Sequence, residues 1–89
     1  MIKNKKRSKY EIYMDVLEAI ASNHYNTITR ISYRTNMPLD RTKEIIELMK
    51  IKGFIREEDF SGRKRYHLTA LGGELLHALK TVKRYLEET

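Results

Sequence analysis

The sequence predicts a mainly helical domain with one β-hairpin, in the order helix, helix, helix, strand, strand, helix. Apolar residues recur at helical spacing near both ends of the chain and in its middle. Two segments of alternating character flank a turn at residues 59 to 62, which is typical of a hairpin. With 89 residues, the chain is long enough for one domain with a single modest core.

The first helix is expected to begin at Ser8, because Ser8 followed by Glu11 is a capping-box pattern. An apolar stripe at helical spacing follows and would face the core. This stripe is formed by Ile12, Val16 and Ile20, with Tyr13 and Leu17 beside it. We expect the helix to stop near Asn23, where a polar connection begins.

The next stretch has the pattern of a helix-turn-helix, in which two short helices are joined by a turn. Thr29 is the expected cap of its first helix, and Asn36 and Met37 make the turn. Pro38 sets the φ angle for the first position of the second helix. Gly53 supplies the left-handed residue that ends this helix.

The second of these helices has one apolar side and one charged side. The apolar side is formed by Leu39, Ile45, Ile46, Leu48 and Met49. The charged side consists of Asp40, Arg41, Lys43, Glu44, Glu47 and Lys50. In a helix-turn-helix, the second helix is the recognition helix, so its charged side would be open to solvent or a ligand.

After Gly53, residues 54 to 58 and 64 to 68 are the expected strands of the hairpin. Its inward side chains would be Ile55, Tyr66 and Leu68. Thr69 is the expected cap of a last helix. The apolar positions of this helix, Leu75, Leu79, Val82 and Leu86, follow a 4-3-4 spacing, and Leu71 and Leu76 widen its first half into a core face.

This order of elements is that of a winged helix-turn-helix with an additional C-terminal helix. We expect residues 1 to 7 to be a basic flexible arm, residues 8 to 69 the winged helix-turn-helix domain, and residues 70 to 89 a C-terminal dimerisation helix. The dimer interface would consist of Leu79, Val82, Tyr85 and Leu86, because a core completed by the earlier leucines leaves these side chains exposed in a monomer.

The distribution of charge indicates a polyanionic partner. The chain has 18 Lys and Arg against 12 Asp and Glu. Residues 1 to 10, 30 to 43 and 63 to 65 together hold twelve of the bases and a single acid, Asp40. The remaining residues hold six bases and eleven acids, so three separated segments are basic while the rest is acidic. One binding face on an otherwise ordinary surface would have this distribution.

The chain also resembles a known family over roughly residues 8 to 79. The residues that carry the resemblance are Ile31 with Tyr33 and Asn36, Gly53-Phe54 followed by Ile55, and Leu68-Thr69 followed by Gly72 and Leu75-Leu76. They resemble small archaeal winged-helix proteins that are described as DNA-binding, chromatin-associated or predicted transcriptional regulators. The resemblance implies a dimer in which the C-terminal helices pair antiparallel, although this helix is shorter than the long versions in the family.

Double-stranded DNA is therefore the expected partner, bound through three basic elements. Arg41 and Lys43, early in the recognition helix, would meet major-groove edges or flanking phosphates, and Arg30 and Arg34 on the preceding helix would meet phosphates. The predicted hairpin, which is the wing of this fold, would contribute Arg63, Lys64 and Arg65. The N-terminal arm would add Lys5, Lys6 and Arg7.

Two acids on the recognition helix oppose a simple contact with phosphates. Either the helix inserts only by its N-terminal end, or Glu44 and Glu47 accept hydrogen bonds from cytosine amino groups. A third interpretation is that they pair with neighbouring bases on a solvated surface. Two alternative functions remain open: a winged-helix protein–protein interaction module with no DNA role, and an RNA-binding protein.

The sequence shows no pattern typical of an enzyme. There is no cysteine, and His24, His67 and His77 lack metal-ligand spacing. No catalytic triad or phosphate-binding glycine loop is present, so we expect no enzymatic activity, no metal and no cofactor, and no small-molecule ligand is evident. No apolar run is long enough for a membrane span, so we expect a cytoplasmic, nucleoid-associated protein.

Overall fold

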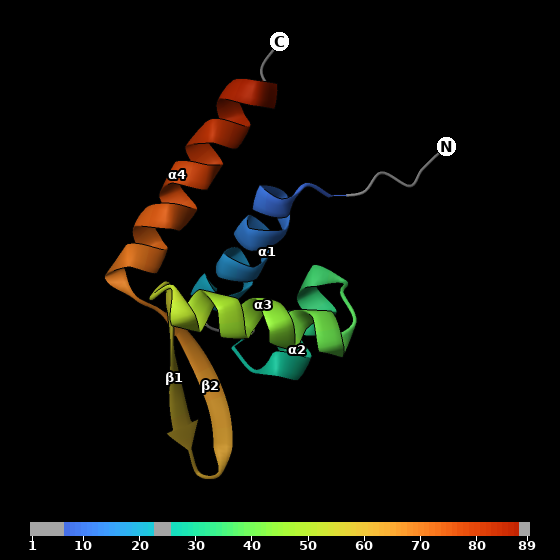
Figure 1. Ribbon diagram of the computed structural model, residues 1–89, viewed down its shortest axis with the longest axis vertical. Helices are drawn as coiled ribbons and strands as arrows, with labels where there is room; N and C mark the ends of the chain where they lie inside the picture. Colours follow the sequence, from blue (N-terminus) through green and yellow to red (C-terminus); the bar gives the residue numbers. More distant parts are fainter. Residues whose placement is uncertain (1–6, 23–25, 88–89) are drawn as a thin grey trace.

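The computed structural model describes residues 7–22 and 26–87 and has the predicted order of elements (Figure 1). The elements are α1 (Lys9–Ala21), α2 (Ile28–Thr35), α3 (Leu39–Ile51), β1 (Ile55–Phe60), β2 (Arg63–Leu68) and α4 (Ala70–Glu87). The mainly helical fold with one antiparallel hairpin is confirmed. The first three helices pack together, α4 packs against α1, and the hairpin projects at the opposite end from the last turn of α4.

The predicted turn signals are mostly confirmed. Ser8 and Glu11 form both hydrogen bonds of a capping box at the start of α1. Asn36, at φ 58°, is the left-handed residue between α2 and α3, and Gly53 follows α3 at φ +84°. The prediction for the start of α2 was wrong: Thr27 and not Thr29 is its cap, because the Thr27 hydroxyl accepts a hydrogen bond from the Arg30 amide at 3.3 Å.

The start of α3 also differs by one residue from the prediction, which placed Pro38 at the first helical position. Pro38 is the N-cap residue of α3, with extended backbone at ψ 152°, and the helix begins at Leu39. A proline in this position sacrifices no helical hydrogen bond, since its missing N–H would have had no intrahelical partner. The Pro38 carbonyl accepts from the Thr42 amide and hydroxyl, at 3.0 and 2.9 Å.

The core lies between α1, α2, α3 and the base of the hairpin. Its fully buried side chains are Val16, Leu17, Ile20, Ile31, Thr42, Ile46 and Met49. The prediction that Leu39 and Leu71 lie in the core was wrong, because their side chains are 46% and 49% exposed. Thr42 is buried instead of Leu39. The Thr42 hydroxyl can be buried because it donates a hydrogen bond to the Pro38 carbonyl. Met14 is a further core residue on α1.

The hairpin is longer than predicted, because its turn contains only two residues. Ser61 and Gly62 both have positive φ, 52° and 79°, as in a type I′ turn. Asp59 and Phe60 therefore belong to β1. Ile55 and Tyr66 are buried and Leu68 is partly buried, as the alternation predicts. In this register Glu57 lies opposite Tyr66 and points to the same face, while Glu58 and Arg65 point to the other.

The beginning of α4 packs closely against Gly53 and Phe54, which connect α3 to β1. The Thr69 hydroxyl donates to the Gly53 carbonyl at 2.6 Å and accepts from the Gly72 amide at 3.0 Å. The Phe54 carbonyl accepts from the Thr69 amide at 3.1 Å. A Cβ at Gly72 would lie 2.0 Å from the Phe54 carbonyl oxygen, whereas a Cβ at Gly73 would meet no atom within 4 Å. Only a glycine fits at Gly72 without displacing the backbone.

We expect Gly72→Ala to lower the free energy of unfolding by roughly 1 to 3 kcal/mol, because α4 must move away from Phe54. Gly73→Ala is the matched control in the same turn of the helix. It should raise stability by about 0.5 to 1 kcal/mol through helix propensity alone. Urea unfolding followed by circular dichroism measures both changes. Equal effects of the two substitutions would contradict the proposed close contact.

Candidate nucleic-acid interface

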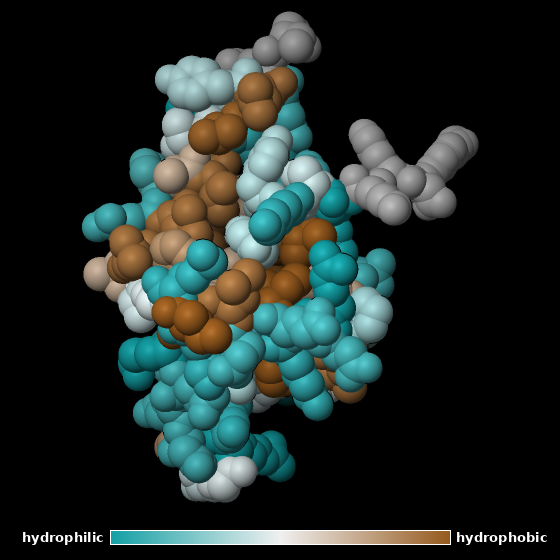
Figure 2. Space-filling model, in the orientation of Figure 1, coloured by the Kyte–Doolittle hydropathy of each residue, from teal (hydrophilic) through white to brown (hydrophobic). Residues whose placement is uncertain are grey.

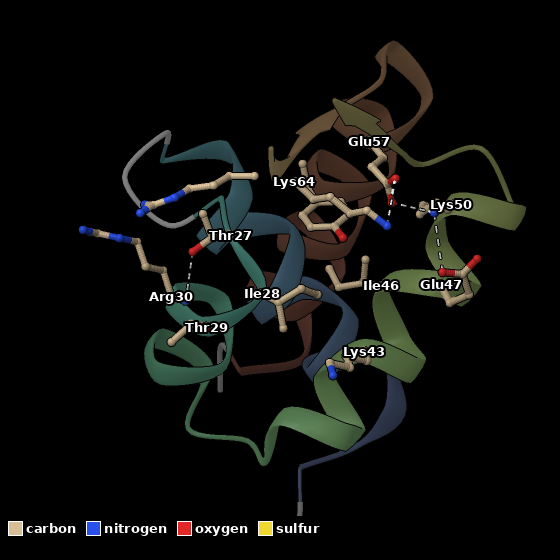
Figure 3. Close-up of a pocket in the computed structure, with 12 residues that line it drawn as sticks. Thr27, Ile28, Thr29, Arg30, Lys43, Ile46, Glu47, Lys50, Glu57 and Lys64 are labelled. Carbon is tan, nitrogen blue, oxygen red and sulfur yellow. Dashed lines mark hydrogen bonds and ion pairs between the residues drawn. The ribbon is translucent and has the colours of Figure 1, made fainter. Parts of the chain in front are cut away.

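An open cleft of about 730 Å³ lies between the start of α2, one side of α3 and the inward face of the hairpin (Figure 3). Its lining residues are Thr27, Ile28, Thr29, Arg30, Lys43, Ile46, Glu47, Lys50, Glu57, Arg63, Lys64 and Tyr66. The apolar floor continues the core, since Ile46 and Tyr66 are both nearly buried. The charged side chains of the lining lie around this apolar floor. The cleft therefore combines an ordered floor with a polar, accessible rim.

Helical spacing explains which side of α3 faces the cleft. Ile46, Glu47 and Lys50 follow Lys43 by three, four and seven residues, so all four side chains share one side of the helix. On the hairpin, strand alternation brings Glu57 and Lys64 to the same inward face as Tyr66. The cap at Thr27 starts α2 directly beside this face, where the Asn26 carbonyl accepts from the Tyr66 amide at 2.9 Å.

The lining carries five cationic side chains and two carboxylates, an excess of three positive charges. The carboxylates are Glu47 and Glu57. Lys43 and Arg63 have no ion-pair partner among residues 7–22 and 26–87. Their charges are therefore available to an anion that enters the cleft, and this makes the cleft a candidate site for a polyanion backbone.

A small ion-pair network joins α3 to the hairpin across the cleft. The Lys50 ammonium is 2.7 Å from Oε1 of Glu57 and 3.5 Å from Oε1 of Glu47. Oε2 of Glu57 is 3.7 Å from the Lys64 ammonium. The hydrogen bond with Lys50 holds the pKa of the Glu57 carboxyl below its ordinary value and raises the pKa of Lys50. Burial, and then the charge of Glu57, raises the pKa of the Tyr66 hydroxyl.

The structure brings four of the sequence-predicted DNA contacts together in this cleft: Arg30, Lys43, Arg63 and Lys64. Arg41 lies elsewhere, in a shallow groove between α1 and α3 that is also lined by Lys9 and Tyr13. Lys5 and Lys6 lie outside the described residues. The predicted contacts thus do not form a single group.

The other three predicted contacts also lie apart from the cleft. Arg7 and Arg34 line a small hollow by α1 and α2, where Nη1 of Arg7 is 2.7 Å from Oδ2 of Asp15. Arg65 is on the outward face of the hairpin, with its guanidinium carbon 4.7 Å from the centroid of the Phe60 ring. That distance is within the range of a cation–π contact.

Sequence reasoning missed Lys50 and Phe60 as candidate site residues. Lys50 is seven residues after Lys43, so the helical repeat could have placed both on one side of α3. Phe60 was assigned to a turn, and only the two-residue turn of the structure moves it onto the strand beside Arg65. Its side chain is 53% exposed.

The outermost side of α3 is acidic. Thr42, Ile45, Ile46 and Met49 are its buried residues, so helical geometry places Asp40, Glu44 and Glu47 on the opposite side. The cations flank this acidic stripe, with Lys43 and Lys50 toward the hairpin and Arg41 toward α1. Any anion held by α3 is therefore held along its sides.

Within residues 7–22 and 26–87, no helix is both long and apolar enough to cross a membrane. The same part of the chain contains no cluster of three or more His, Asp or Glu residues arranged to hold a metal ion. His67 is instead paired with Glu58 on the outward face of the hairpin, at 2.7 Å.

Solved structures share this fold. Sso10a-2, a DNA-binding protein from Sulfolobus solfataricus, matches with a TM-score of 0.78 and 22% identity over 91% of this chain and 83% of that chain. A MarR family transcriptional regulator from Silicibacter pomeroyi matches with a TM-score of 0.69 and 23% identity, over 83% of this chain and 54% of the regulator. This chain thus spans about half of that protein.

A third structure holds nucleic acid. A mutant of MepR from Staphylococcus aureus bound to an oligodeoxyribonucleotide matches with a TM-score of 0.74 and 16% identity, over 85% of this chain and 59% of MepR. No curated protein matches the sequence significantly. The family model described as "Winged helix-turn-helix" matches residues 6–87, nearly the whole chain. The chain therefore belongs to the winged helix-turn-helix family.

Proposed function

We propose that this protein binds double-stranded DNA, with the phosphate backbone of one strand in the cleft between α3 and the hairpin. The observation that supports this most directly is the convergence of five cations from α2, α3 and the hairpin on one accessible cleft. The neighbours add support at the level of fold, because Sso10a-2 is a DNA-binding protein and the MepR mutant is bound to an oligodeoxyribonucleotide. Phosphate neutralisation would supply most of the affinity.

In this arrangement the first turns of α3 approach the major groove and the hairpin tip approaches the neighbouring minor groove. Arg30 and Lys43 would hold phosphates on one wall of the cleft, and Arg63 and Lys64 on the other. Arg41, on the far side of α3, would reach the opposite edge of the groove. Asp40 and Glu44 would then face the base edges, where carboxylates accept hydrogen bonds from cytosine amino groups, while Glu47 stays at the edge of the cleft beside Lys50.

We further propose that the protein acts as a homodimer, as a transcriptional regulator or a chromatin-associated protein on DNA in the cytoplasm. Apolar residues of α4 follow alternating spacings of four and three: Leu71, Leu75, Ala78, Val82 and Tyr85. Figure 2 shows apolar surface along α4 and toward the end of α3. Val82, Tyr85 and Leu86 are 45%, 67% and 63% exposed, respectively. A heptad stripe of this kind typically pairs with another helix.

The small side chain of Ala78 lies at the middle of this stripe. An antiparallel pair of α4 helices crossing at Ala78 would set Leu71 of each chain against Tyr85 of the other. Leu79, which was expected in the interface, and Leu75 of the stripe are both partly buried against the core and would contribute less. Dimerisation would place two clefts on one assembly and so increase affinity for a duplex with two matching sites.

DNA binding should weaken steeply with salt, and loss of a cleft cation should flatten that dependence. We expect Lys43→Ala and Arg63→Ala each to reduce the slope of log affinity against log salt by about 0.9. Lys80→Ala is the control, because Lys80 lies on α4 and pairs with Glu18 at 2.9 Å. Fluorescence anisotropy with a labelled duplex between about 50 and 200 mM salt measures the slopes.

Absence of duplex binding by the wild-type chain would refute DNA binding and favour a protein-interaction module. Equal slopes for Lys43→Ala and Lys80→Ala would remove the cleft from the DNA site. Competition by a duplex RNA of matched length tests the third possible function, since A-form RNA presents a deep, narrow major groove that α3 cannot enter.

The dimer has its own test. Light scattering should give twice the 10.6 kDa chain mass for the wild type. Val82→Lys combined with Leu86→Lys should give a monomer, because the two added charges would be buried in the helix pair. Lys80→Ala, at a position that faces α1 and pairs with Glu18 at 2.9 Å, should leave the mass unchanged. A wild-type monomer at high concentration would refute the helix pairing.

A further inference from the structure

We propose that the Glu57 carboxylate stands in for a DNA phosphate between Lys50 and Lys64 in the unbound protein, and that the DNA backbone displaces it from these lysines on binding. This proposal rests on the proposed DNA-binding function and assigns a specific role to one acid in the cleft. Glu57 would act by tuning the charge that the cleft presents. It would lower the affinity of the cleft for any polyanion and thereby limit non-specific binding.

The geometry of the network supports this role (Figure 3). Oε1 of Glu57 is 2.7 Å from the Lys50 ammonium on α3, and Oε2 is 3.7 Å from the Lys64 ammonium on the hairpin. One carboxylate thus uses its two oxygens to bridge cations from the two walls of the cleft. A phosphate group bridging the same two walls would use its two free oxygens in the same way. The two anions cannot occupy this position together.

Glu57 is not needed to hold the hairpin against the helices. Ile55 and Tyr66 are 3% and 5% exposed and anchor the base of the hairpin in the core. The Tyr66 amide donates to the Asn26 carbonyl at 2.9 Å, and the Thr69 amide donates to the Phe54 carbonyl at 3.1 Å. These contacts fix the hairpin from its base up to the Glu57–Tyr66 pair without using the ion pairs of Glu57. The ion pairs of Glu57 therefore mainly set the charge that the cleft presents.

The carboxylate divides the cleft cations into two classes. Lys50 and Lys64 are paired with Glu57, whereas Lys43 and Arg63 have no ion-pair partner in the described part of the chain. Phosphate contacts by the unpaired cations add their full counterion release to binding. Lys50 and Lys64 must first exchange the Glu57 carboxylate for a phosphate, so their phosphate contacts add less to the binding affinity. Removing the Glu57 charge should free Lys64 and leave Lys50 with only its longer ion pair to Glu47, at 3.5 Å.

The test compares two neighbouring glutamates of β1. Glu57→Gln keeps the shape of the side chain but removes its charge. Glu58→Gln removes the same charge from the outward face, where Glu58 pairs with His67 at 2.7 Å. We expect Glu57→Gln to bind a labelled duplex roughly twofold to tenfold more tightly than the wild type at low salt. Its salt slope should steepen by about 0.9 for each phosphate that the freed lysines neutralise. Glu58→Gln should change both quantities less.

A double-mutant cycle isolates the pair. Lys50→Ala should weaken binding little in the wild type and more in the Glu57→Gln background, because Lys50 has then lost its closer ion pair, at 2.7 Å, and keeps only the one with Glu47, at 3.5 Å. Lys43→Ala should weaken binding by the same factor in both backgrounds. Thermal unfolding by circular dichroism shows whether each variant keeps the fold, and near-equal melting temperatures are expected.

Three results would overturn the proposal, and they are distinguishable. If the wild type does not bind duplex DNA, the proposed function fails and this proposal fails with it. If the wild type binds and a folded Glu57→Gln binds no more tightly than Glu58→Gln, only the role of Glu57 is refuted. If Lys50→Ala costs the same factor with and without Glu57, the carboxylate does not compete for that lysine.

Discussion

The close packing at the junction of α3, the hairpin and α4 is the constraint on which the rest of the structure depends. Gly53 ends α3 with positive φ, and its carbonyl accepts from the Thr69 hydroxyl, which also caps α4. Gly72 brings the first turn of α4 against the Phe54 carbonyl. Because three elements leave this one point, its geometry sets both the opening between α3 and the hairpin and the direction of α4. The candidate DNA site and the proposed dimer surface therefore share one structural origin.

Alternation along the hairpin gives its two faces different chemistry. The inward face carries Glu57 and Lys64 beside buried Tyr66, and it closes the cleft with charges that can be exchanged for those of a ligand. The outward face carries Phe60 under the Arg65 guanidinium. The wing cations, which appear as one basic run in the sequence, are thus divided between two environments. Strand alternation directs Lys64 inward and Arg65 outward, whereas Arg63, at the end of β2 beside the turn, also lines the cleft.

The sequence predicted the order of elements because its strongest local signals agree with the fold. The capping box at Ser8, the turn at Asn36 and the glycine after α3 each act over a few residues, and all three are confirmed. The errors arose where tertiary packing decides. Leu39 and Leu71 have apolar side chains at helical spacing, yet the core is filled without them. Periodicity identifies an apolar side of a helix but not the point at which the core is complete.

The sequence by itself determined the helices, the hairpin and an excess of positive charge in three segments, because hydrophobic spacing, turn residues and composition are local properties. Only the tertiary structure decided which charges meet. Arg30, Lys43 and Arg63 converge on one cleft, whereas Arg41 turns to the other side of α3 and Arg65 to the other face of the hairpin. A basic segment specifies how much charge is present, but the direction of each side chain depends on which side of its helix or strand is buried. That choice is made by the packing of residues far apart in the chain.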